Sequence, residues 1–118
     1  MSWDVWVYED PGSGVEGIHD CGLNYTHNCN RMMRRALDAV GSLEMLGEDH
    51  LYALDGMPCQ DTGVMLDAAM RWWADNPDIM AEMNPANGWG DSVSAYRFWR
   101  TVADMCLAHP AGTLRMDG

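Results

Sequence analysis

Two short segments combine amide, glycine and aromatic residues immediately before a predicted helix. The first is Asn24–Asn28, with the sequence NYTHN, and the second is Asn84–Gly90, with the sequence NPANGWG. Asn and Gly are favoured where the backbone turns sharply, but such turns do not require a Tyr or a Trp. A large ring beside free backbone amides at the start of a helix suits a flat or anionic ligand. A rigid structural corner would use the same residues, so the pattern leaves both interpretations open.

The first segment is followed by the main basic cluster of the chain. Arg31, Arg34 and Arg35 lie within the next two helical turns. A helix N-terminus carries partial positive charge, and Arg binds phosphate or carboxylate bidentately, so together they could hold an anion. In the alternative interpretation the polar residues cap the helix, the Tyr packs inward and the arginines pair with neighbouring acids. The ligand-binding residues predicted here are Tyr25, Thr26, His27, Asn28 and Arg31.

The second segment has a Trp between two glycines. Gly88 and Gly90 flank Trp89 and give the backbone unusual freedom. The indole could stack on a base or sugar while Asn87 binds polar edges. Alternatively, Trp89 covers the start of the following helix and the Asn side chains satisfy turn amides. The ligand-binding residues predicted here are Asn87, Gly88 and Trp89.

Two His-x-Cys pairs supply residue types that bind zinc. A separation of one residue is unlike the usual spacing of zinc ligands, so we predict no metal site. The four His and Cys residues are weak candidates should one exist. No nucleophile motif, no phosphate-binding Gly-Lys motif and no Lys is present, which favours a non-enzymatic protein without a cofactor. The four metal candidates are His19, Cys21, His27 and Cys29.

Composition favours a single acidic domain. The chain has 118 residues, of which 47% are hydrophobic, and its net charge is −11 from 18 acidic and 7 basic residues. This size suits one domain over residues 1–118, and the acidity argues against direct binding to nucleic acid. The charge would suit a basic protein partner or mimicry of DNA. We expect a cytoplasmic protein with reduced cysteines and no membrane contact, because neither a signal peptide nor a long apolar run is present.

Hydrophobic periodicity predicts an α+β fold. Strands are expected at 3–9 and 113–116, with three main helices packed on the small antiparallel sheet that these N- and C-terminal strands form, in the order β-α-α-α-β. A third strand is expected from 15–18 or 51–54, or dimerisation extends the sheet. A short helical turn is expected at 42–46. The helices are expected at 28–40, 62–75 and 92–108, with a short one at 77–83.

Cap residues and apolar stripes refine these helices. Asp61 or Thr62 is expected to cap the second main helix, and Asp91 or Ser92 the third. The third helix carries two apolar stripes, which indicates burial against two neighbours. Both neighbours could belong to the same chain, or one could lie across a homo-oligomer interface.

Several motifs together resemble a group of small uncharacterised proteins encoded by phages of GC-rich actinobacterial hosts. The resemblance covers most of the chain and implies a source and a layout, without a reaction. It would place the protein in the cytoplasm of the host cell. The matching residues are Asn24, Tyr25, Thr26, Asn28, Leu54, Asp55, Gly56, Asn84, Pro85, Asn87, Gly88, Trp89, Gly90, His109 and Pro110.

These observations lead to two functional hypotheses. The first is a phage accessory protein that captures a small polar or anionic, nucleotide-like ligand between the two loops and so counters host defence. The second is an acidic inhibitor or DNA mimic that acts on a basic host protein. Salt would weaken the second interaction steeply, and a stacked ligand less so.

Overall fold

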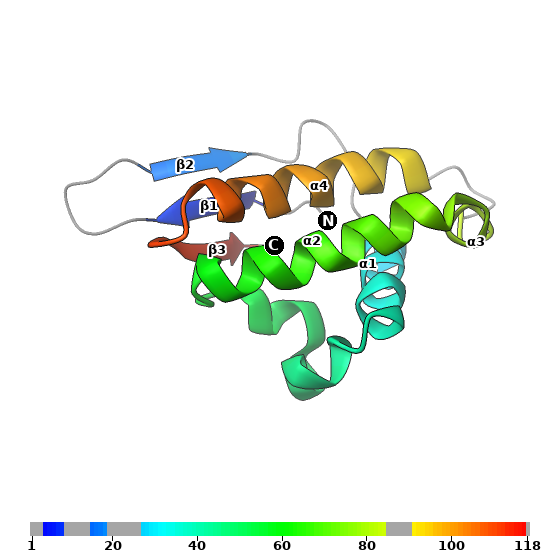
Figure 1. Ribbon diagram of the computed structural model, residues 1–118, viewed down its shortest axis with the longest axis horizontal. Coiled ribbons are helices and arrows are strands. Elements are labelled where there is room, and N and C mark those ends of the chain that lie inside the picture. Colours follow the sequence, from blue (N-terminus) through cyan, green and yellow to red (C-terminus); the bar gives the residue numbers. More distant parts are fainter. Residues whose placement is uncertain (1–3, 9–14, 19–26, 85–90, 118) are drawn as a thin grey trace.

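A computed structural model describes residues 4–8, 15–18, 27–84 and 91–117. Figure 1 shows α2 and α4 side by side across the front, the strands towards one end of this pair, and η1 projecting below. The predicted α+β class is confirmed. In chain order the elements are β1 (Asp4–Tyr8), β2 (Val15–Ile18), α1 (His27–Ala39), the 3-10 helix η1 (Leu43–Leu54), α2 (Cys59–Asp75), α3 (Pro77–Ala81), α4 (Ser92–Ala108) and β3 (Thr113–Asp117).

The sheet joins the two ends of the chain, as predicted. Its order is β2-β1-β3 and both pairings are antiparallel. The third strand is Val15–Ile18, whereas residues 51–54, the other candidate, belong to η1. The outer edge of β3 is also bonded, because Gly56 N donates to Leu114 O at 2.7 Å and Leu114 N donates to Met57 O at 2.9 Å. This pairing covers an edge that would otherwise expose free backbone groups.

One face of the sheet belongs to the core. Val5 and Val7 of β1 are buried beside Leu114 and Met116 of β3, while Tyr8 is exposed. This alternation is expected for a strand with one solvated face. A Cβ atom at Gly112, just before β3, would lie 2.6 Å from Val7 Cγ1, so the chain can pass this point only with glycine.

Helix α4 has the predicted bounds and cap. The Asp91 side chain accepts a hydrogen bond from Ser94 N at 2.8 Å, which satisfies one of the free amides at a helix start. Both apolar stripes are buried within the one chain, against α2, α1, α3 and the sheet. The fold therefore accounts for the two stripes without a second subunit, and the homo-oligomer stays a prediction. The buried residues of the two stripes are Phe98, Val102 and Met105, and Trp99, Ala103 and Cys106.

Helix α2 begins at Cys59, so the prediction of a start at residue 62 with an Asp61 or Thr62 cap was wrong. Pro58 stands at the cap position and makes no side-chain cap bond. The first turn is instead tied to the C-terminal part of the chain, since Cys59 N donates to Gly112 O at 2.8 Å. Thr62 is buried, and its hydroxyl donates back to Pro58 O at 2.9 Å. A tertiary contact thus sets where this helix starts.

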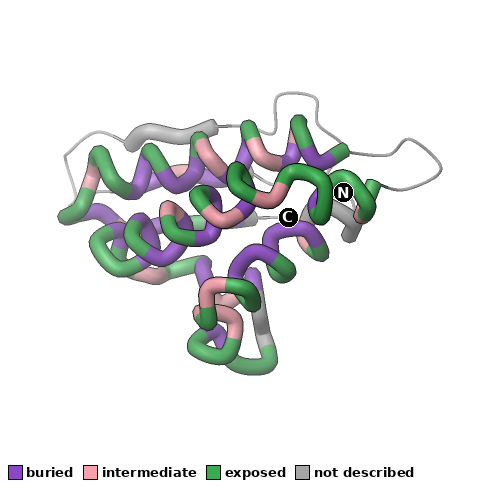
Figure 2. Tube along the Cα trace, turned by 45° about the vertical axis from the view of Figure 1, so that its right-hand side comes forward, coloured by how far each residue is buried: buried purple, intermediate pink, exposed green. Residues whose placement is uncertain are grey.

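Helix α1 packs its apolar stripe inward. Met32, Met33, Ala36 and Leu37 are fully buried, as their spacing predicts, and Gly41 ends the helix with a φ of 77°. Figure 2 shows the buried stripes of the helices turned towards the middle of the molecule. After Gly41 the chain forms the 3-10 helix η1 over the whole of Leu43–Leu54, where the sequence predicted a short helical turn at 42–46 and an extended or helical segment at 51–54. Its buried residues Leu46, Leu51 and Leu54 join the core.

Candidate functional site

Most of the residues predicted to bind a ligand lie outside the described part of the chain. Tyr25 and Thr26 precede α1, and Asn87, Gly88 and Trp89 fall between α3 and α4. The backbone of His27 and Asn28 forms the first residues of α1, and their side chains are again outside the described part. Among the predicted ligand-binding residues, Arg31 is the one whose side chain lies in the described part of the chain.

Helical periodicity places the basic cluster on the surface. Because Met32, Met33, Ala36 and Leu37 face the core, the positions between these residues must face solvent. The exposed positions are Arg31, Arg34, Arg35 and Asp38.

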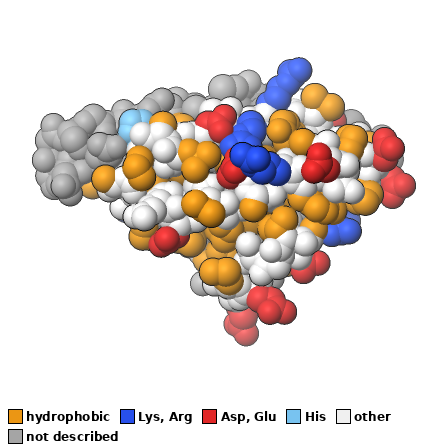
Figure 3. Space-filling view, viewed as in Figure 1, with side chains coloured by type: hydrophobic (Ala, Val, Ile, Leu, Met, Phe, Trp, Pro, Cys, Tyr) orange, Lys and Arg blue, Asp and Glu red, His pale blue; other side chains and the backbone are white. Residues whose placement is uncertain are grey.

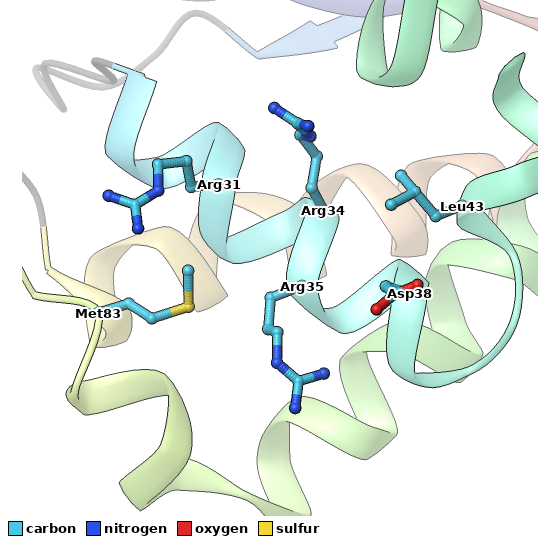
Figure 4. Close-up of a pocket in the computed structure, with 6 residues that line it drawn as sticks. All are labelled: Arg31, Arg34, Arg35, Asp38, Leu43 and Met83. Carbon is cyan, nitrogen blue, oxygen red and sulfur yellow. The ribbon is translucent and has the colours of Figure 1, made fainter. Parts of the chain in front are cut away.

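These exposed side chains surround a pocket. It is an open surface depression with a volume of about 450 Å³, large enough for a small molecule that stays partly exposed to solvent. Figure 4 shows Arg31 beside Met83, Asp38 and Leu43 on the other side, and Arg34 and Arg35 extending in opposite directions. We call this feature the arginine pocket; its lining residues are Arg31, Arg34, Arg35, Asp38, Leu43 and Met83.

The arginine pocket adjoins both predicted loops along the chain. Arg31 is four residues, about 6 Å of helix, after His27. Met83, which lies beside Arg31 in Figure 4, immediately precedes Asn84, where the second segment starts. The Asn84 side chain accepts a hydrogen bond from Ser92 N at 2.8 Å. That bond is the structural role that the alternative interpretation gave to the Asn residues of this segment.

The arginines of the pocket differ from most other arginines in their partners. Arg71, Arg100 and Arg115 each form a salt bridge with an aspartate. Within the described chain, Arg31 and Arg34 form no ion pair with any acid. The Arg35 guanidinium lies 5.0 Å from the centre of the Trp72 ring, a cation–π contact that leaves its outer donors available.

The charges on α1 have opposing effects on the stability of the helix. Arg31 lies three and four residues from Arg34 and Arg35, and like charges at these spacings destabilise a helix by about 0.2–0.5 kcal/mol per pair. Arg34 and Arg35 lie four and three residues before Asp38, and opposite charges at these spacings stabilise a helix by a similar amount. The charge pattern is therefore close to neutral for helix stability, and the case for a ligand rests on the pocket.

Sequence reasoning found Arg31 and noted Arg34 and Arg35, but it missed the other lining residues. Asp38 stands seven residues after Arg31, two helical turns away on the same side, so its spacing could have been used. Leu43 and Met83 come from outside α1 and reach the pocket through tertiary packing. No local pattern in the sequence marks them.

The described residues contain no group of three or more His, Cys, Asp or Glu side chains that could hold a metal. The metal candidates His19 and Cys21, and the side chains of His27 and Cys29, lie outside the described part of the chain. None of the described helices has the length and apolar character needed to cross a bilayer.

The described cysteines are unsuited to nucleophilic chemistry. Cys59 of α2 and Cys106 of α4 are fully buried. Burial and, to a smaller extent, the neighbouring Cys59 thiol together raise the pKa of the Cys106 thiol to about 12. A thiol with this pKa holds its proton at neutral pH and is a poor nucleophile.

A second pocket is smaller and mainly apolar. It has a volume of about 240 Å³ and lies between the end of α2 and the start of α4. Trp73 and Tyr96 line it with their rings edge to face and their ring centroids 5.9 Å apart, and the exposed Val93 also lines it. It offers little for a charged ligand, so the arginine pocket is the better candidate for the predicted anion.

On the face shown in Figure 3, the described acidic side chains do not form a single patch. Figure 3 shows them spread over several elements on this face, with the central ones beside arginines. Asp67 lies between Arg71 and Arg100, and Asp104 pairs with Arg100. The acidic inhibitor remains a prediction without a structural feature that singles it out.

Comparison with known proteins adds no relative: no protein-family model, no curated protein and no solved structure matches the chain. The resemblance to phage proteins therefore stays a prediction based on the motifs.

Proposed function

We propose that the protein is a non-enzymatic binding protein for a small phosphate-bearing anion, which it holds in the arginine pocket. The observation that carries the proposal is a set of arginines on α1 whose charge is not neutralised by described acids, in a chain of net charge −11. Guanidinium groups bind phosphate oxygens bidentately. The finer hypothesis, a phage accessory protein that acts against host defence, rests on the motif resemblance alone.

The shape of the pocket supports a small ligand. Arg31 and Met83 stand at one side and Leu43 at the other, so an anion at the centre could be reached by more than one guanidinium after side-chain rotation. Each immobilised long side chain costs about 0.5–1.5 kcal/mol, which favours multiply charged anions that repay the loss with several bonds. Tripolyphosphate is the simplest probe with this property.

The direct test compares two double variants with equal net charge. Arg31→Gln/Arg34→Gln removes two charges from the pocket, whereas Arg71→Gln/Arg97→Gln removes two exposed charges elsewhere. In isothermal titration calorimetry with tripolyphosphate, we expect the first variant to lose at least about tenfold in affinity, as for loss of charge-assisted hydrogen bonds. The second should bind within about twofold of the parent. Equal losses in the two variants would reject a localised site.

The second predicted loop can be tested with nucleotides. Trp89 lies outside the described residues and follows Met83, a lining residue of the pocket, by six positions in the chain. We predict that Trp89→Ala weakens nucleotide binding and leaves the thermal midpoint within about 2 °C of the parent. A large fall in thermal midpoint would instead support the structural role of Trp89 at the start of α4.

A further inference from the structure

The arginine pocket contains a carboxylate that the proposed anion would not use. Asp38 lines the pocket and is exposed, and it forms no salt bridge with any described residue. An ionised carboxylate only accepts hydrogen bonds and repels a phosphate. A site that binds only an inorganic anion would bind that anion more tightly without the Asp38 carboxylate.

An arginine followed four residues later by an aspartate occurs on both α1 and α4, but the two pairs differ in their contacts. On α4, Arg100 and the acid four residues later pair, with Arg100 Nη2 2.7 Å from Asp104 Oδ1. On α1, Arg34 and Asp38 have the same order and spacing without a salt bridge, and Figure 4 shows the Arg34 side chain pointing away from Asp38. The carboxylate thus remains free to accept hydrogen bonds from a ligand.

The pocket therefore carries opposite charges at its two ends along α1. Its basic end spans Arg31 to Arg35 and its acidic end is Asp38, about 10 Å along the axis from Arg31. Figure 4 shows Met83 beside Arg31 at the basic end and Leu43 on the same side as Asp38 at the acidic end. A matching ligand is anionic at one end and carries N–H or O–H donors, together with some apolar surface, at the other.

We infer that the ligand is a nucleotide, with its phosphates at the arginines and its base or sugar donating to Asp38. This inference rests on the proposed function, because it assigns a substrate class to the same pocket. The volume of about 450 Å³ accommodates a ligand of this size. Exocyclic amino groups and ribose hydroxyls are the donors that a carboxylate recognises in nucleosides.

The test compares pyrophosphate with the four ribonucleoside diphosphates by isothermal titration calorimetry at one fixed ionic strength. For the parent protein, we expect at least one nucleoside diphosphate to bind about tenfold or more tightly than pyrophosphate. Asp38→Ala removes the acceptor, and it should reduce this preference to less than about threefold. Pyrophosphate itself should bind equally well or more tightly to Asp38→Ala, since a repelling charge is lost.

Asp75→Ala is the matched control. Asp75 is exposed in the last turn of α2, as Asp38 is in the last turn of α1, and it does not line the pocket. The control changes net charge equally and should retain the full preference for the nucleoside diphosphate. A preference lost equally in both variants would mean that overall charge, rather than contact with Asp38, produces it.

The outcomes separate this inference from the proposal beneath it. If pyrophosphate and all four nucleoside diphosphates bind equally, and Arg31→Gln/Arg34→Gln weakens them all, the anion site stands and the nucleotide inference is wrong. If none of these probes binds the parent protein, both are wrong. A nucleotide preference that survives Asp38→Ala also overturns the assignment of Asp38.

Discussion

The paired helices α2 and α4 and the outer face of α1 use the same residue type in opposite ways. Arg100 of α4 is largely covered and donates to Asp67 of α2 at 2.8 Å and to Asp104 at 2.7 Å. Arg31 and Arg34 of α1 are exposed and have no acidic partner in the described chain. Arg100 thus joins two helices, whereas the guanidinium groups of Arg31 and Arg34 remain available to bind a ligand.

Packing follows the same division. At Gly63 of α2, a Cβ atom would lie 3.1–3.2 Å from Cys106 and Leu107 of α4, so the two helices approach unusually closely. These helices form the most extensive contact in the molecule. The outer face of α1 instead opens onto a pocket. The difference indicates that stability resides in the α2–α4 pair, while the α1 face can be changed at little structural cost.

The largest expected effect is loss of core packing in the α2–α4 region. Leu66 of α2 is fully buried, so Leu66→Ala should lower the free energy of unfolding by about 2–5 kcal/mol. Val64 lies two residues earlier and is 65% exposed, and Val64→Ala should change stability by less than about 0.5 kcal/mol. Urea denaturation of both variants provides the comparison. Similar values for the two would contradict the assignment of the core.

A smaller loss is expected from the salt-bridge network. Arg100→Gln removes the bonds to Asp67 and Asp104, and should lower the unfolding free energy by about 1 kcal/mol. Arg97, three residues earlier on α4, is exposed and makes a suitable control. If Arg97→Gln and Arg100→Gln are equally mild in urea denaturation, the network does not join the helices energetically.

Several features of this stable region could be predicted from the sequence because they are local. The alternation of the N-terminal strand, the apolar stripes of α4 and the Asp91 cap each depend on neighbouring residues. The pairing of the two terminal strands was also expected, since each strand needs a partner. The start of α2 was missed because Cys59 N bonds to Gly112 O, 53 positions away in the chain.

The candidate site was less predictable for the same reason. Arg31 was identified from its position after the first loop, and the pocket contains it. Leu43 follows the end of α1, and Met83 follows α3, so their approach to Arg31 depends on how η1 and α3 pack. A local sequence pattern carries no information on such contacts.

Acid pH should weaken the paired region. Hydrogen bonding to Arg100 lowers the pKa of Asp67, with a further contribution from Arg71, against the opposing effect of burial. A lowered folded-state pKa contributes stability above the ordinary value of about 3.9, and this contribution is lost as pH falls from about 4 through the folded-state pKa. Urea denaturation between pH 6 and 2.5 should therefore show falling stability below about pH 4.

The variant Asp67→Asn should flatten part of that decline, because it removes one of the groups that must take up a proton. Asp55 offers a second case, since the hydrogen bond from Met116 N lowers its pKa and Arg115 lowers it further. Asp55→Asn should flatten another part. If both variants keep the full decline of the parent protein, these two carboxylates are not its source.

The smallest effect is expected on α1, and its sign is the informative part. Arg31→Gln/Arg34→Gln removes like charges spaced three and four residues apart and replaces them with a residue of similar helix propensity. The free energy of unfolding should stay the same or rise by up to about 0.5 kcal/mol, as measured by urea denaturation. Arg100→Gln, the same chemical change on α4, should lower it. A loss of 1 kcal/mol or more in the α1 variant would mean that these arginines support the fold, and the argument for a ligand that uses them would fall with that result.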